Sequence, residues 1–168
     1  PFDDLSVDLI YKYRSAVYNS ADEPGIPGAS ENLIRALKVV FHYNYNKTMT
    51  LVTRIDLNRI SPSGSGGMML TQDMRLCLGK LPLTLWMRYS LFKTDDWGSR
   101  IYSYENDLLN SFSIPAFEGD GSRSYIMANW EFGKWSELRI KYALTTASSD
   151  KEITATRDEF KVQFRVWF

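Results

Sequence analysis

The most regular feature of the chain is its C-terminal end, where apolar and polar residues alternate without a break. Successive side chains of a β-strand point to opposite faces, so this pattern gathers every second side chain on one apolar face. An outer-membrane barrel needs such a closing strand, because one face meets lipid and the other a polar lumen. A half-buried strand of a soluble antiparallel sheet alternates in the same way. The apolar set, which would also be the signal for barrel assembly, is Phe160, Val162, Phe164, Val166 and Phe168.

The same alternation recurs along the chain in segments of about ten residues, the length that a tilted membrane strand requires. Helical periodicity is nearly absent. We count about eight strands, and single-chain bacterial barrels use even numbers. The segments are residues 5–14, 33–45, 49–58, 68–78, 83–91, 126–132, 138–144 and 160–168.

Short and long connections alternate between these segments. Tight turns are predicted at residues 46–47, 79–80 and 133–135, and long loops at 19–31, 61–67, 94–122 and 145–158. Outer-membrane barrels have short periplasmic turns and long extracellular loops. Residues 100–109 would fit a further strand, but a ninth span would put the tight turns on opposite sides. We therefore assign them to the large outer loop, as a short hairpin above the membrane.

Composition supports this interpretation. The 168 residues suit one domain, and the zero net charge argues against nucleic-acid binding. The aromatic content of 14% is typical of a barrel with two aromatic girdles, whereas a soluble sandwich gives aromatic residues no reason to form two bands. No run of about 18 apolar residues predicts a transmembrane helix. The single cysteine excludes an internal disulfide.

The inward-facing positions are rich in charge, and an eight-stranded lumen is only wide enough for side chains to fill it. Such charges must pair, so we expect a salt-bridge plug. A small ion path is the alternative. The expected lumen charges are Asp8, Lys12, Arg14, Lys38, Arg54, Asp56, Asp73, Arg75, Arg88, Glu131, Glu137, Arg139, Lys141, Glu159, Lys161 and Arg165.

No pattern in the chain predicts catalysis, a cofactor or a metal site. His42 is the only histidine, and no nucleophile or orienting acid accompanies it in sequence, so a structural role is expected. Cys77 has no predicted activating partner. The acidic turn around Asp120 lacks the EF-hand spacing that would predict a calcium loop.

The connection at residues 94–122 is the best candidate for a functional surface, because loops of this length are usually functional or disordered. Its apolar content argues against disorder. We expect it to cover the barrel mouth as a lid or to contact a partner protein. The residues of that surface are Trp97, Tyr102, Tyr104, Phe112, Ile114 and Phe117.

The stretch RIYSYENDLLNSFSIPAFEGDGSR, at residues 100–123, adds a resemblance to a known family. It is similar to the C-terminal barrel region of helix-hairpin-helix, competence-protein-like proteins of the Bacteroidota, and the resemblance extends from about Leu33 onward. It implies an outer-membrane location and a longer parent chain, but no mechanism. The helix-hairpin-helix part is absent here, so DNA binding does not carry over.

The sequence thus predicts an all-β fold, an antiparallel transmembrane β-barrel over residues 1–168, in the bacterial outer membrane. We expect no enzyme activity and a structural or accessory role in a cell-envelope complex. The expected partners are outer-membrane lipid, the barrel assembly machinery during insertion and other envelope proteins. The alternative is a transport pore, which requires further strands to complete a wider barrel.

Overall fold

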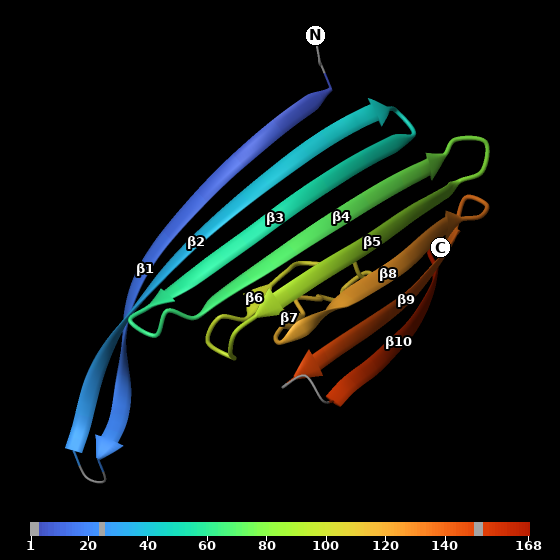
Figure 1. Ribbon diagram of the computed structural model, residues 1–168. Helices are drawn as coiled ribbons and strands as arrows, with labels where there is room; N and C mark the ends of the chain where they lie inside the picture. The colour runs from blue at the N-terminus through green and yellow to red at the C-terminus, as the bar shows by residue number, and fades with distance from the viewer. Residues whose placement is uncertain (1–3, 24–25, 150–152) are drawn as a thin grey trace.

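The computed structural model describes residues 4–23, 26–149 and 153–168, with side chains given outside residues 16–31 and 149–154. Eight long strands form one antiparallel sheet and two short strands form a second (Figure 1). The alternation of apolar and polar residues accounts for the long strands, because it suits a sheet with two different faces. Their bounds are β1 Leu5–Glu23, β2 Ile26–Asn46, β3 Met49–Ser61, β4 Gly66–Leu78, β5 Leu83–Thr94, β6 Ile101–Tyr102, β7 Ala116–Phe117, β8 Asp120–Glu131, β9 Ser136–Ser149 and β10 Ile153–Val166.

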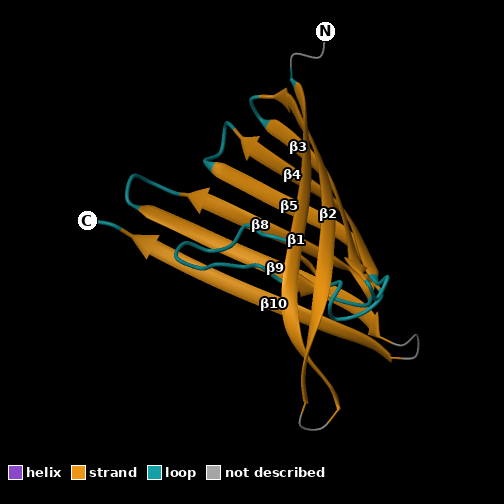
Figure 2. Ribbon diagram, turned by 90° about the vertical axis from the view of Figure 1, so that its left-hand side faces the viewer, coloured by secondary structure: helices purple, strands orange, loops and turns teal. Residues whose placement is uncertain are grey.

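The large sheet has the order β1-β2-β3-β4-β5-β8-β9-β10, so every long strand lies beside its neighbour in the sequence. The all-β antiparallel prediction is confirmed, and so is the count of eight long strands. The sheet curls strongly, with a concave and a convex face (Figure 2). It is open, since no ladder joins β1 to β10 among the described residues. The predicted closure into a barrel is therefore not seen.

The predicted connections are only partly correct. Tight turns do join β2 to β3, β4 to β5 and β8 to β9, and we call that end of the sheet the tight-turn end. Two predicted long loops are wrong, because β1 and β2 extend through most of residues 19–31, and β9 and β10 through most of 145–158. The Gly and Pro residues at 24–28 favoured a loop, but strand pairing continues from Ser20↔Gly28 to Glu23↔Ile26 across a shift in register.

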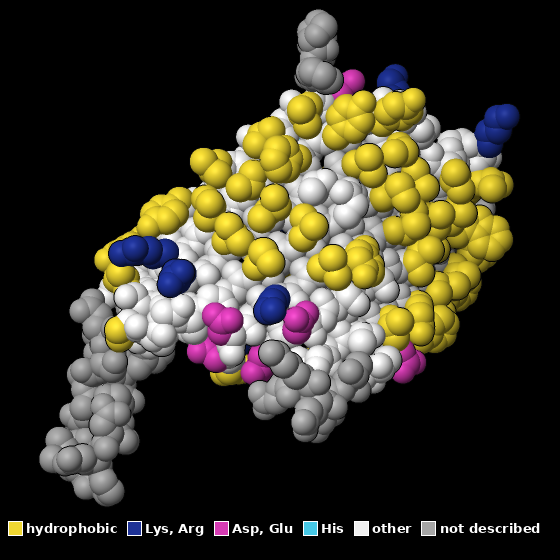
Figure 3. Space-filling model, in the orientation of Figure 1, with side chains coloured by type: hydrophobic (Ala, Val, Ile, Leu, Met, Phe, Trp, Pro, Cys, Tyr) yellow, Lys and Arg dark blue, Asp and Glu magenta, His cyan; other side chains and the backbone are white. Residues whose placement is uncertain are grey.

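The convex face exposes apolar side chains on all eight long strands (Figure 3). A monomer in water rarely exposes a continuous apolar surface of this extent. Two polar side chains on this face form a hydrogen bond with each other, in which the Thr53 hydroxyl donates to the Gln72 side chain over 2.7 Å. Among the exposed apolar residues are Leu9, Phe41, Leu57, Leu70, Leu91, Ile126, Tyr142 and Phe164.

The core lies on the concave face. One cluster joins Met69 and Phe92 of the sheet to Ile101 and Phe117 of β6 and β7. A second consists of Tyr125, Met127 and Ala143, with Trp86 packed against it. The sheet therefore buries its concave side and leaves its apolar convex side bare.

Candidate functional site

The connection between β5 and β8, residues 95–119, lies against the concave face of the sheet, and we call it the inner loop (Figure 2). Strands β6 and β7 pair within it, and a bridge joins Glu105 to Ser113. Its hydrogen bonds reach from Arg54 of β3 to Gln163 of β10. The expected hairpin above the membrane is thus wrong in position, because the loop extends along the sheet instead of projecting from its end.

The inner loop enters the concave side through a turn fixed to β3 and β4. The Asn58 side chain donates to the carbonyl of Ser99 over 2.8 Å. A Cβ on Gly67 would lie 2.5 Å from that same carbonyl oxygen, so only glycine permits the approach. The backbone N–H of Ser99 donates to the Asp96 carboxylate over 2.8 Å and lowers the pKa of Asp96 below its ordinary value.

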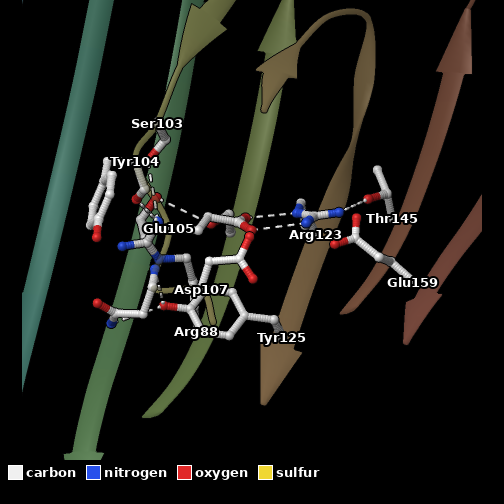
Figure 4. A network of polar contacts seen from close by, with 12 residues as sticks. Arg88, Ser103, Tyr104, Glu105, Asp107, Arg123, Tyr125, Thr145 and Glu159 are labelled. Carbon is white, nitrogen blue, oxygen red and sulfur yellow. Dashed lines mark hydrogen bonds and ion pairs between the residues drawn. The ribbon is translucent and has the colours of Figure 1, made fainter. Parts of the chain in front are cut away.

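Glu105 is the central residue of the inner loop (Figure 4). It is fully buried, and its carboxylate accepts two hydrogen bonds from Arg123, at 2.6 Å and 2.8 Å. Lys141, which is also fully buried, lies 3.3 Å from the same carboxylate. The Lys141 ammonium stands over the ring of Tyr125, 4.9 Å from its centroid. The two cations share the Glu105 carboxylate, and Asp107, 3.8 Å from Lys141, supplies the second negative charge.

A second centre surrounds Arg88 of β5, which is buried. Its guanidinium holds the Asp73 carboxylate with two nitrogens, and it donates to the backbone carbonyl of Tyr104. Arg54 lies 3.6 Å from Asp73 and donates to the Ser103 hydroxyl over 3.1 Å. Arginine side chains of the sheet therefore bind the inner loop both at a backbone carbonyl, that of Tyr104, and at a side chain, that of Ser103.

The tip of the inner loop reaches far toward the tight-turn end. Asp107 pairs with Lys161 at 2.8 Å and lies 3.8 Å from Lys141. The Gln163 side chain accepts from the backbone N–H of Leu109 and donates to its carbonyl. Gln163 is only three residues from the end of β10, so the loop runs almost the length of the sheet.

Several of the expected lumen charges meet as predicted. Asp73, Arg54 and Arg88 form one cluster, and Lys38 pairs with Asp56 at 3.1 Å. Arg139 and Arg165 share Glu137, and Lys161 pairs with Glu159 at 2.7 Å.

The other expected charges are not part of this network. Asp8 pairs with His42 at 3.3 Å, Arg75 lies over Trp86, and Glu131 accepts from Asn129. Lys12 and Arg14 are exposed, with no ion-pair partner among the described residues. The predicted salt-bridge plug is therefore present at the centre of the sheet, but it does not include Lys12 and Arg14 of β1.

Three residues of this charge network, Glu105, Asp107 and Arg123, are not among the charges predicted from the sequence. Arg123 precedes the predicted strand at 126–132, although extending the alternation through Tyr125 would have placed it on the inward face. Glu105 and Asp107 carried no such signal, because they lie in an irregular segment.

The aromatic residues of the loop divide into two groups. Phe117 is buried and packs on Phe92 with ring centroids 5.0 Å apart, so it is a core residue and not part of a contact surface. The remaining predicted surface residues, Trp97, Tyr102, Tyr104, Phe112 and Ile114, are exposed. Some of them line a cavity of about 390 Å³ between the loop and β8 to β10, together with Arg157 and Glu159.

Other chemistry has little support among the described residues. They contain no group of three or more His, Cys, Asp or Glu side chains placed to hold a metal ion. Cys77 is a free, half-buried thiol. Across the same ranges, no helix is long and apolar enough to cross a membrane. Comparison with protein-family models, curated proteins and solved structures finds no match.

Proposed function

We propose that this chain forms the wall of an outer-membrane β-barrel and acts, without catalysis, as a structural or accessory subunit of a cell-envelope complex. The observation that carries the proposal is the bare apolar convex face, which extends over all eight long strands. Lipid is the solvent that such a face matches, while the charges at the centre of the concave face are paired with one another. The resemblance of residues 100–123 to Bacteroidota barrel regions agrees with this location.

The closing strand fits the same proposal. Phe160, Val162 and Phe164 all expose their side chains on the convex side of β10. Barrel assembly machinery would recognise this alternating, aromatic-ended strand during insertion. Other envelope proteins would then contact Trp97, which is exposed close to the end of β5, where the inner loop begins.

Two consecutive residues of β1 provide the test. Leu9 is 70% exposed on the convex face, and Ile10 is 41% exposed on the concave face. Spin labels at Leu9→Cys and at Ile10→Cys, each in a Cys77→Ser background, would be measured in lipid vesicles for access to oxygen and to a water-soluble nickel complex. We expect the label at position 9 to favour oxygen and the label at position 10 to favour nickel. Equal access to nickel at both positions would contradict membrane insertion.

A transport pore is the second candidate function, and the open sheet favours it. A wall with further strands would be wider than eight strands allow, and wide barrels hold aqueous channels. Single-channel recording in planar bilayers separates the two functions. No steady current supports a plugged structural barrel, and a large stable conductance supports transport.

A further inference from the structure

The convex face changes from apolar to polar side chains at a border near the end of the sheet opposite the tight turns. Leu57 of β3 and Leu91 of β5 are exposed apolar residues on this face, and the next convex positions toward that end are Arg59 and Lys93. Figure 3 shows basic side chains along the lower edge of the apolar surface. In a membrane barrel, such a border lies where the hydrocarbon of the bilayer meets the lipid headgroups.

Two arginines stand directly opposite each other on this border. The register pairs Arg35 of β2 with Arg59 of β3, and both residues are exposed. Directly opposed side chains of an antiparallel pair have Cβ atoms about 4.5–5.5 Å apart, and like charges at this spacing repel each other. Neither arginine has an ion-pair partner among the described residues. The two positive charges therefore favour an anion between them.

The neighbouring positions explain why this pair has no anion of its own. On the β4 side, Arg59 stands opposite Gly66, which has no side chain. The Gly66 N–H donates to the Asp95 carboxylate over 2.8 Å, but this carboxylate forms no ion pair with Arg59. Farther along the same border, Lys93 lies 3.7 Å from Asp120 of β8. Among the described residues, the border is thus neutralised within the chain at β5 and β8, but not at β2 and β3.

The surroundings of the arginines suit a lipid better than a free anion. Tyr13 of β1 stands opposite Arg35 on the other side and is 60% exposed. Aromatic residues are typical of barrel positions at the headgroups, and a tyrosine hydroxyl can donate to a phosphate oxygen. Toward the tight-turn end, the same face continues with the exposed side chains of Tyr11 and Leu57. An acyl chain attached to the bound anion has an apolar surface to lie on there.

We propose that Arg35 and Arg59 bind the anionic headgroup phosphate of one membrane lipid, with Tyr13 as an additional donor. The binding site rests on the membrane barrel proposed above, because the acyl chains of the lipid lie against the convex face. Two guanidinium groups hold a phosphate through several charge-assisted hydrogen bonds, which are stronger than neutral ones. The phosphate supplies the negative charge that the pair lacks, and the hydrocarbon covers Leu57.

Native mass spectrometry of the full chain tests the proposal. The chain would be refolded in vesicles of equal amounts of phosphatidylglycerol and phosphatidylcholine with the same acyl chains, and then extracted into mild detergent. We expect one phosphatidylglycerol to be retained per chain in preference to phosphatidylcholine, whose choline group neutralises the phosphate. Arg59→Gln should lower this retention about tenfold, because charge-assisted hydrogen bonds are lost. Lys93→Gln is the matched control, since it also removes one exposed cation from the border, and it should leave retention unchanged.

Three results would overturn the proposal. Equal retention of the two lipids would mean that the arginines do not select a net negative charge. Equal losses in Arg59→Gln and Lys93→Gln would mean that the total surface charge, and not this pair, holds the lipid. Displacement of the lipid by an equal concentration of inorganic phosphate would mean that the site binds free phosphate and does not use the acyl chains.

Failure of the membrane barrel itself would be seen in a different measurement. If the spin labels at positions 9 and 10 show no insertion, the barrel and the lipid site are both contradicted. If the labels confirm insertion and no phosphatidylglycerol is retained, only the lipid site is contradicted. Arg35→Gln is a second variant of the pair, so the test stands even where Arg59→Gln fails to fold.

Discussion

The two faces of the large sheet place their side chains in opposite environments, exposed on the convex face and covered on the concave face. On the convex face, Leu70 and Ile126 are exposed, and no segment among the described residues covers them. On the concave face, the inner loop covers Met69 and Lys141 completely. A convex residue therefore depends on its solvent, whereas a concave residue depends on a distant part of the same chain. The difference predicts that substitutions on the two faces destabilise the fold for different physical reasons.

The largest effect is expected from Glu105→Ala, which sharpens the comparison on the concave side. It leaves Arg123 and Lys141 buried without their shared carboxylate, and the loss of one partner from a buried ion pair costs about 3–5 kcal/mol. The free energy of unfolding would be measured by urea titration in lipid vesicles. Glu118→Ala is the control, since Glu118 lies on the same loop but is exposed, and it should change the free energy by less than about 0.5 kcal/mol. Equal losses in both variants would show that Glu105 has no special role.

On the convex side, Leu70→Arg should cost about 2–4 kcal/mol in lipid, because an arginine then faces the hydrocarbon interior. Leu81→Arg, in the turn between β4 and β5, should cost about 0–1 kcal/mol, as expected near the membrane interface. The same urea titration in vesicles gives both values. If Leu70→Arg were as mild as Leu81→Arg, the convex face would not be a lipid face.

A smaller effect is expected at the entry of the inner loop. Gly67→Ala forces a methyl group against the carbonyl of Ser99, and such overpacking typically costs about 1–3 kcal/mol. Gly79→Ala is the control, because a Cβ there meets nothing within 4 Å. Hydrogen exchange of the loop amides should accelerate in Gly67→Ala alone. Unchanged exchange would mean that the turn at residues 96–99 does not hold the loop in place.

The smallest effect concerns pH. The hydrogen bond from the Ser99 N–H lowers the pKa of Asp96 in the folded state, so its contribution is present above the unfolded pKa of about 4. That contribution is lost as pH falls through the lowered folded pKa. Asp96→Asn should therefore reduce stability slightly at pH 7 and make stability less sensitive to acid. Parallel pH profiles of the two proteins, from thermal unfolding, would argue against this contribution.

The same division between the two faces separates what the sequence predicts from what it does not. The convex face is predictable, and the covering of the concave face is not. The strands and the tight turns at residues 46–47 and 79–80 are local features, since alternation and turn residues act over a few positions. The convex face follows from them directly. The inner loop depends on contacts across 18 residues from Glu105 to Arg123 and 54 residues from Asp107 to Lys161. Nothing in residues 100–109 distinguishes these carboxylates from those of an exposed loop.

The length of the inner loop along the sheet also constrains the order in which the molecule can form. A hairpin that contacts both β3 and β10 cannot be threaded into a finished wall, because its backbone would have to pass the side chains that already fill the interior. It must therefore be in place before the last strand edges pair. Contacts this distant in sequence form slowly, because a long segment must be ordered before any of them is gained. In the proposed barrel, pairing at the edges of β1 and β10 would thus be the final step of assembly, after the hairpin is in place.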